Sequence, residues 1–237
     1  ILDLRGNPGG LLDQAEKISD LFLTNGVIVT TKVGNSTKHY HANDKDHQYA
    51  GNVVVLVDAG SASASEIVAG ALKNNGRAVI IGERTFGKGS VQQIFDLHDG
   101  SALKLTIAQY LTPGDISIQD VGVTPDIILH PTIITEDTII FNSNLEPRLN
   151  KLNGKSDKPI QENRENPTYS ITYLEDVEIN DDEEEPKPEE ALTKKEKREK
   201  IENDFYVLLA RDVILSSKVP SRQEALGQIQ KNIIKII

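Results

Sequence analysis

The run 52–58 constrains the fold of this chain more than any other segment. Between Asn52 and Asp58 the sequence reads Val-Val-Val-Leu-Val. An uninterrupted apolar strand is typical of a strand buried on both faces, which requires a parallel sheet with helices on its two sides. The next segment, residues 60–66, reads Gly-Ser-Ala-Ser-Ala-Ser-Glu and leads into an apolar helix pattern that Gly76 ends. We therefore expect an α/β domain with a serine-rich turn at the carboxyl end of a central strand.

Short apolar runs alternate with helical periodicity over residues 1–130, which we predict to form one α/β core. The polar segment 35–48 inside it is expected to be an exposed loop or hairpin. The further strands are expected at 1–4, 27–31, 79–82, 91–95, 102–107 and 127–129, and the helices at 11–22 and 66–75.

The pattern changes after residue 130. Residues 131–152 form an extension that the pattern does not assign. Residues 153–192 are polar and acidic and contain four prolines, so we predict a disordered linker. Two capping-box patterns, Thr193–Glu196 and Ser221–Glu224, mark helix starts within 193–237. We expect a helical hairpin there whose apolar faces need a partner surface, in a second copy or another protein.

Composition excludes several classes of protein. The net charge is −10, and ten acidic side chains fall within residues 175–190, so a nucleic-acid partner is not expected. Because the chain has no cysteine, it has no disulfide, thiolate metal site or cysteine nucleophile. It has no methionine and begins inside a predicted strand, so we expect an internal fragment that lacks its N-terminus. His39 and His41 have no third metal ligand nearby, so we expect surface residues and no metal or other cofactor.

The serine-rich turn is the candidate for chemistry. Ser63 would lie at the edge of the sheet, where α/β folds place ligands. A serine needs a base to become a nucleophile, and a neutral lysine can serve as one when burial lowers its pKa. Lys88, between Gly87 and Gly89, is such a candidate. If the two side chains meet, the chain is a serine hydrolase without a catalytic histidine, although Ser61 and Ser65 remain alternatives with expected roles in the turn and helix cap.

Candidate donors for a negatively charged oxygen surround this turn. The Ala64 N–H lies at the start of the predicted helix, where backbone donors are unpaired. The Gly9–Gly10 turn offers a second N–H group, and either glycine allows close approach to a substrate. Gln92, four positions after Lys88, is suited to hold the lysine amine without adding charge.

These residues stand in stretches that resemble a known family. The chain is similar to the carboxy-terminal processing peptidases, or tail-specific proteases, at residues 1–12 (ILDLRGNPGGLL), 60–67 (GSASASEI), 82–93 (GERTFGKGSVQQ) and 122–126 (GVTPD). The resemblance implies a spiral of ββα units, as in ClpP and crotonase-like proteins, followed here by a C-terminal helical appendage. It also implies an endopeptidase that recognises exposed C-termini of protein or peptide substrates and cuts near them.

By the same resemblance, Ser63 is the nucleophile, Lys88 the base and Gln92 its supporting amide, with Ala64 and Gly9 or Gly10 as oxyanion donors. Family members usually act in the periplasm or another extracytoplasmic compartment. They normally carry a PDZ domain before the first strand, so we expect substrate recognition to lie outside this sequence. This chain also has Ile116 at a position where family members often have an arginine. A non-catalytic peptide-binding or scaffold member of the same fold and a crotonase-like acyl-CoA enzyme are the alternatives.

Overall fold

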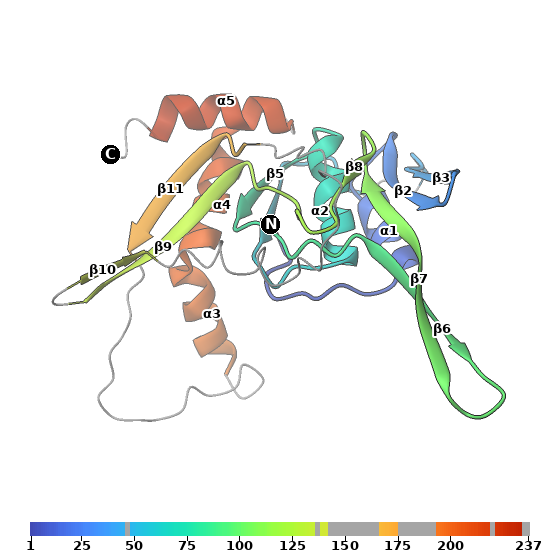
Figure 1. The fold of residues 1–237 in the computed structure, drawn as a ribbon. Helices are drawn as coiled ribbons and strands as arrows, with labels where there is room; N and C mark the ends of the chain where they lie inside the picture. The colour runs from blue at the N-terminus through green and yellow to red at the C-terminus, as the bar shows by residue number, and fades with distance from the viewer. Residues whose placement is uncertain (46–47, 136–137, 142–165, 175–192, 219–220, 234–237) are drawn as a thin grey trace.

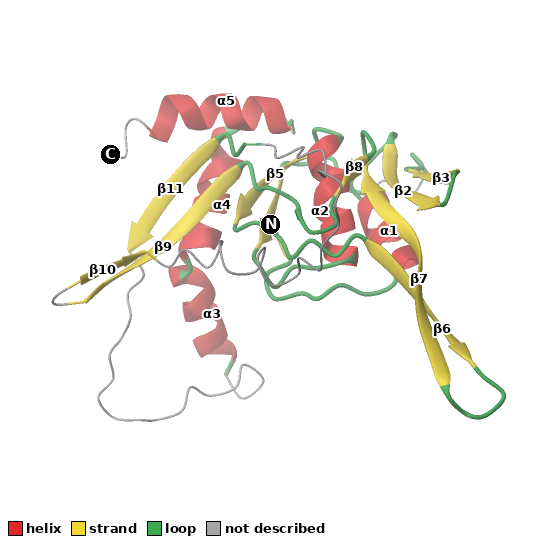
Figure 2. Ribbon diagram, in the orientation of Figure 1, coloured by secondary structure: helices red, strands yellow, loops and turns green. Residues whose placement is uncertain are grey.

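The computed structural model describes residues 1–237 except 46–47, 136–137, 142–165, 175–192, 219–220 and 234–237 (Figures 1 and 2). The elements are β1 (Leu2–Asp3), α1 (Leu12–Asp20), β2 (Val27–Val33), β3 (Ser36–His41), β4 (Val53–Val57), α2 (Ala64–Asn74), β5 (Ala78–Gly82), β6 (Ser90–Asp96), β7 (Ala102–Thr112), β8 (Ile116–Ser117), β9 (Ile127–Thr135), β10 (Thr138–Phe141), β11 (Tyr169–Leu174), α3 (Lys194–Asn203), α4 (Phe205–Ser216) and α5 (Arg222–Ile233).

The first sheet has the strand order β1-β4-β5-β9-β10, and β11 pairs with β9. All of its pairings are parallel except that of β9 with β10. Every residue of β4 is buried. Val53, Val55 and Val57 belong to the core cluster that includes α2, whereas Val54 and Leu56 belong to the cluster formed with α4 and α5. Burial of alternate residues against helices on opposite faces explains the uninterrupted apolar run and confirms the predicted α/β class with a parallel sheet.

The second sheet is antiparallel and has the order β3-β2-β7-β6, with β8 paired to β7. Strand β3 lies within segment 35–48, which was expected to be a loop or hairpin, and it forms an antiparallel hairpin with β2, which precedes that segment. Strands β6 and β7 form a long hairpin that extends away from the helices (Figure 1). Among the described residues, no helix has the length and apolar character needed to cross a membrane.

Two features differ from the expectations for residues 131–237. Residues 169–174 fall within the predicted linker but form β11, which pairs in parallel with β9 from Tyr169 opposite Ile127 to Leu174 opposite Thr132. The first predicted helix of the hairpin is divided at Asp204, whose side chain accepts hydrogen bonds from the N–H groups of Tyr206 and Val207. Asp204 is therefore an internal N-cap that starts a new helix. Three parts of the predicted extension and linker, 136–137, 142–165 and 175–192, lie outside the described residues.

The surface that covers the C-terminal helices belongs to the same chain. Ala210 and Val213 of α4, and Ala225 and Ile229 of α5, are buried against the first sheet. Arg222, at the start of α5, forms an ion pair with Asp126, whose side chain is 1% exposed. The predicted need for a partner surface is thus met within the described residues by the face of the first sheet opposite α2.

Candidate functional site

The segment between β4 and α2 folds into a tight turn centred on Ser63. The Ser65 N–H donates to the Ala62 carbonyl oxygen at 3.1 Å. Ser63 has φ 56° and ψ −113°. These angles are those of the first central residue of a type II′ turn, a position that glycine normally occupies. A side chain in this conformation costs on the order of 1–3 kcal/mol and is characteristic of functional positions.

The three serines of this turn have different environments. Ser61 is fully buried, and its hydroxyl donates to the Leu4 carbonyl oxygen at 2.7 Å. Ser65 is also buried, and its hydroxyl donates to the Asn7 carbonyl oxygen at 3.0 Å. Ser63 is only partly buried. Ser61 and Ser65 thus join the turn to the segment after β1, and Ser63 is the accessible serine.

One carboxylate joins the Ser63 turn to the Lys88 loop. Glu66 is fully buried. Its Oε2 atom accepts hydrogen bonds from the Ser63 and Lys88 N–H groups, both at 2.8 Å. Its Oε1 atom accepts from Thr85 Oγ1 at 2.6 Å and from the Gly87 N–H at 2.7 Å. The backbones of the two residues predicted to form the dyad are therefore held around a single carboxylate oxygen.

The side chains of the predicted dyad are not joined in this structure. The Lys88 side chain is exposed rather than buried as expected, and within the described residues no hydrogen bond links its Nζ atom to Ser63 Oγ. Gln92 is also exposed and lies on β6 opposite Thr106. The fold brings the backbones of Ser63 and Lys88 together but leaves the lysine amine in solvent.

The segment 5–10 lies against the Ser63 turn. The Asn7 carbonyl oxygen accepts from the Ala62 N–H at 3.0 Å. A Cβ atom placed on Gly9, which has φ +103°, would lie 2.5 Å from the Ala62 carbonyl oxygen and 2.9 Å from Ser63 Cβ. Only glycine fits this contact. Asp58 adds a further link, because its carboxylate accepts from the Gly6 N–H at 2.9 Å and from the N–H of Ser61 at 3.0 Å.

Some backbone N–H groups near Ser63 donate hydrogen bonds to other described residues, and others do not. The Gly9 N–H donates to Asn7 Oδ1 at 2.9 Å. Within the described residues, neither the Ala64 N–H nor the Gly10 N–H donates a hydrogen bond. Unpaired N–H groups at a helix start attract a negatively charged oxygen. Ala64 and Gly10 are therefore the free donors among those predicted.

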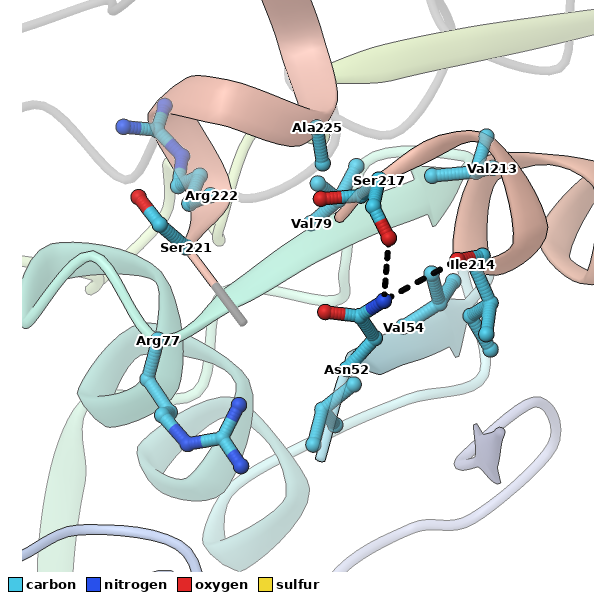
Figure 3. A pocket seen from close by; sticks show the side chains of 11 residues that line it. Asn52, Val54, Arg77, Val79, Val213, Ile214, Ser217, Ser221, Arg222 and Ala225 are labelled. Carbon is cyan, nitrogen blue, oxygen red and sulfur yellow. Dashed lines mark hydrogen bonds between the residues drawn. The ribbon is translucent and has the colours of Figure 1, made fainter. Parts of the chain in front are cut away.

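Other candidates do not contribute to this site. His39 and His41 both lie on β3, and His39 Nδ1 is hydrogen-bonded to Thr30 Oγ1 at 2.8 Å. Among the described residues no three His, Cys, Asp or Glu side chains are grouped to hold a metal ion. A small cavity of about 10 Å³ lies between β4, β5 and the helices α4 and α5 (Figure 3). It has room for about one water molecule, and none of its lining residues belongs to the Ser63 site.

Sequence reasoning missed the roles of Glu66 and Asp58. The Ser63–Glu66 spacing is that of a capping box, and this was the one local signal for Glu66. The contacts of Glu66 to Thr85, Gly87 and Lys88 come from a distant part of the chain. No pattern in the sequence marked Asp58 as the link to segment 5–10.

The residues that build this site fall within a region matched by a family model. The model of peptidase family S41 matches residues 1–129, which carry Ser63, Glu66 and Lys88. The chain belongs to peptidase family S41. Helices α3, α4 and α5 lie outside the S41 match.

Curated relatives of this chain include carboxy-terminal processing proteases. One from Bartonella bacilliformis is 52% identical over 131 residues, which cover 54% of this chain and 30% of the relative. One from Bacillus subtilis is 44% identical over 128 residues, which cover 54% of this chain and 28% of the relative. The structure of a photosystem II D1 C-terminal processing protease matches with a TM-score of 0.51 and 41% identity, over 54% of this chain and 33% of that one. The chain thus spans about a third of the length of these relatives.

Proposed function

We propose that this chain provides the catalytic core of a serine endopeptidase that cleaves protein substrates near their C-termini. The observation that carries the proposal is the Ser63 turn. In this turn a serine takes a backbone conformation that glycine normally occupies, and it lies beside two unpaired backbone N–H groups. The Ser63 and Lys88 N–H groups both donate to the Glu66 carboxylate. A strained nucleophile turn of this kind exposes the serine oxygen at the edge of a sheet.

In the proposed reaction, neutral Lys88 takes the proton of the Ser63 hydroxyl as Ser63 Oγ attacks the carbonyl carbon of the scissile peptide bond. The Ala64 and Gly10 N–H groups bind the resulting oxyanion, since the Gly9 N–H is engaged by Asn7. Lys88 then gives its proton to the leaving amine. Water hydrolyses the acyl-enzyme and regenerates the serine.

The exposed position of the Lys88 amine calls for a rearrangement before this chemistry. Lysine has four rotatable bonds, and its backbone N–H is already fixed to Glu66. We infer that a bound substrate covers the amine and directs it toward Ser63, with Gln92 holding it in line. Closure around substrate commonly completes such sites.

The proposal also includes the finer expectations from the family resemblance. These are the spiral of ββα units, substrates with exposed C-termini and an extracytoplasmic location. The solved relative whose name specifies processing of the photosystem II D1 C-terminus supports the substrate class. The curated relatives include bacterial and chloroplastic processing proteases, which is consistent with the location.

The test compares Ser63→Ala and Lys88→Ala with two matched controls, Ser101→Ala and Lys104→Ala, which change exposed residues of the β6–β7 hairpin. Peptides with free or amidated C-termini are incubated with each protein, and products are identified by mass spectrometry. We expect cleavage near the free C-terminus that both site variants abolish and both controls retain. Cleavage that survives in Lys88→Ala would exclude the dyad.

The exposed Lys88 amine favours one second candidate, a non-catalytic peptide-binding member of the family. The same peptides distinguish the two functions. A binding protein would retain peptide, measured by fluorescence anisotropy, without producing fragments. It would also form no covalent adduct at Ser63 with a fluorophosphonate, whereas the proposed peptidase would.

A further inference from the structure

We propose that the start of helix α4 positions the oxyanion segment, residues 5–10, by binding the side chain of Arg5. The inference rests on the proposed function, because it assigns a role in catalysis to residues outside the S41 match. Asp204 and Tyr206 are positioning residues in this view. They act on the backbone donors through Arg5 rather than by touching the substrate.

The Arg5 guanidinium is bound from several directions. Its Nη2 atom lies 2.8 Å from Asp204 Oδ2 and 2.6 Å from Asp3 Oδ2. Its Nε atom donates to Asp3 Oδ1 at 2.9 Å. Its central carbon lies 5.0 Å from the centroid of the Tyr206 ring, within cation–π range. The planar guanidinium suits this combination of ionic and aromatic contacts, which a lysine would not reproduce.

Arg5 is continuous with the segment that carries the donors. The residue before it, Leu4, accepts the Ser61 hydroxyl through its carbonyl oxygen. The residue after it, Gly6, donates its N–H to the Asp58 carboxylate. Gly9 then contacts the Ser63 turn directly. A displacement of Arg5 would therefore be passed along a short chain of bonded residues to the Gly10 N–H.

Helix α4 is fixed firmly enough to hold Arg5. Asn52 Nδ2 donates to the carbonyl oxygens of Ile214 and Ser217 at 3.0 and 2.9 Å, as the dashed lines in Figure 3 show. At the other end of the helix, the rings of Phe205 and Tyr173 are stacked with centroids 4.6 Å apart. Asn52, the residue before β4, and Tyr173 of β11 thus anchor the two ends of α4.

Asp204 allows the contact with Arg5 to be separated from the stability of the helix. Its Oδ1 atom accepts from the N–H groups of Tyr206 and Val207, whereas its Oδ2 atom pairs with Arg5. Asparagine is as good an N-cap as aspartate. Asp204→Asn therefore keeps the cap and removes the charge that faces Arg5. Asp212→Asn on the same helix is the matched control, because Asp212 pairs with Arg211 and its side chain is 55% exposed.

The experiment measures two quantities on the full chain. The first is hydrogen exchange of a peptide covering residues 5–10, which needs no enzymatic activity. The second is kcat for the peptide substrate defined above. Loss of an entire oxyanion donor costs a factor of about 100–1,000 in kcat, so a displaced donor should cost about tenfold. For Asp204→Asn we expect faster exchange and this loss of kcat, with KM and the urea midpoint little changed.

A second pair of variants tests the aromatic contact. Tyr206→Leu removes the ring beside Arg5 and should reproduce the effect of Asp204→Asn, whereas Tyr206→Phe retains the ring and loses only the hydroxyl, which is hydrogen-bonded to Tyr173 rather than to Arg5. Unchanged exchange and kcat in Asp204→Asn, or equal effects in Asp212→Asn, would overturn the inference. If the unmodified chain cleaves no peptide, the proposed function fails, and with it the catalytic role assigned to Asp204. The exchange data would then report only whether α4 orders the segment.

Discussion

The substitution Glu66→Gln tests whether one carboxylate organises the site. Glu66 is fully buried and accepts four hydrogen bonds, two at each oxygen. Glutamine keeps the size of the side chain but replaces one acceptor oxygen with an NH2 donor. The less costly orientation turns the NH2 group toward Thr85 and Gly87, because the Thr85 hydroxyl can rotate to accept a hydrogen bond. The Gly87 N–H cannot rotate and would lose its acceptor.

The cost follows from these contacts. A buried donor left without an acceptor costs about 1–3 kcal/mol. The two bonds retained by Ser63 and Lys88 would change from charge-assisted to neutral and lose about half their strength, or about 1 kcal/mol each. We therefore expect Glu66→Gln to lower the free energy of unfolding by about 3–5 kcal/mol, a large part of the 5–15 kcal/mol typical of a whole domain.

Urea unfolding followed by far-UV circular dichroism measures this change, and a constant m-value would show that the unfolded state is unaffected. Glu199→Gln is the control, because Glu199 lies on α3 in an exposed ion pair with Lys195. It should change the unfolding free energy by less than about 1 kcal/mol. Peptide cleavage by Glu66→Gln should also fall, since the backbones of Ser63 and Lys88 are less firmly held. A loss below about 1 kcal/mol with unchanged cleavage would refute the assigned role of Glu66.

Three further predictions concern other contacts. Gly9→Ala should abolish peptide cleavage and lower the melting temperature, because its Cβ would overlap the backbone of the Ser63 turn; retained cleavage would contradict the close contact. Burial raises the pKa of Asp3, but hydrogen bonds from Arg5 outweigh this and leave it below its ordinary value of 3.8. The stability from Asp3 is therefore present above pH 3.8 and lost as pH falls through the lowered pKa, so in urea titrations Asp3→Asn should destabilise the chain at pH 6 and by progressively less as the pH falls below 3.8. Arg222→Met should cost about 3–5 kcal/mol in the same assay, because the buried Asp126 carboxylate would lose its counter-charge and keep the Ile80 N–H as a donor; a neutral result would show that Asp126 needs no counter-charge.

Local sequence patterns predicted the elements whose causes are themselves local. The five successive apolar residues of β4 predicted a strand buried on both faces. The helices that begin at Lys194 and Arg222 each follow the first residue of a predicted capping box. Asp204 was missed because apolar periodicity continues across it, from Ile201 to Phe205. The N-cap geometry depends on a backbone bend that periodicity does not report.

Strand β11 was not predicted because of the composition of the residues around it. Its six residues lie in a polar, proline-containing stretch that predicts a linker. Pairing with β9 supplies backbone hydrogen bonds, and a parallel partner can lie far away in the sequence. Its side chains contribute as well, because Tyr169, Ile171 and Tyr173 alternate along the strand and pack against the core cluster formed with α4 and α5.

The sequence by itself determined the α/β class of the core, the strand–turn–helix around Ser63 and the residue types available for catalysis, because these depend on neighbours within a few positions. Only the tertiary structure decided which serine is accessible, which donors are unpaired and that Glu66 joins Ser63 to Lys88. It also decided that Arg5 contacts Asp204 and Tyr206 at the start of α4, which lie far from it in the sequence. Such contacts depend on which surfaces pack together once the sheet has formed, and the spacing of residues along the chain does not encode this.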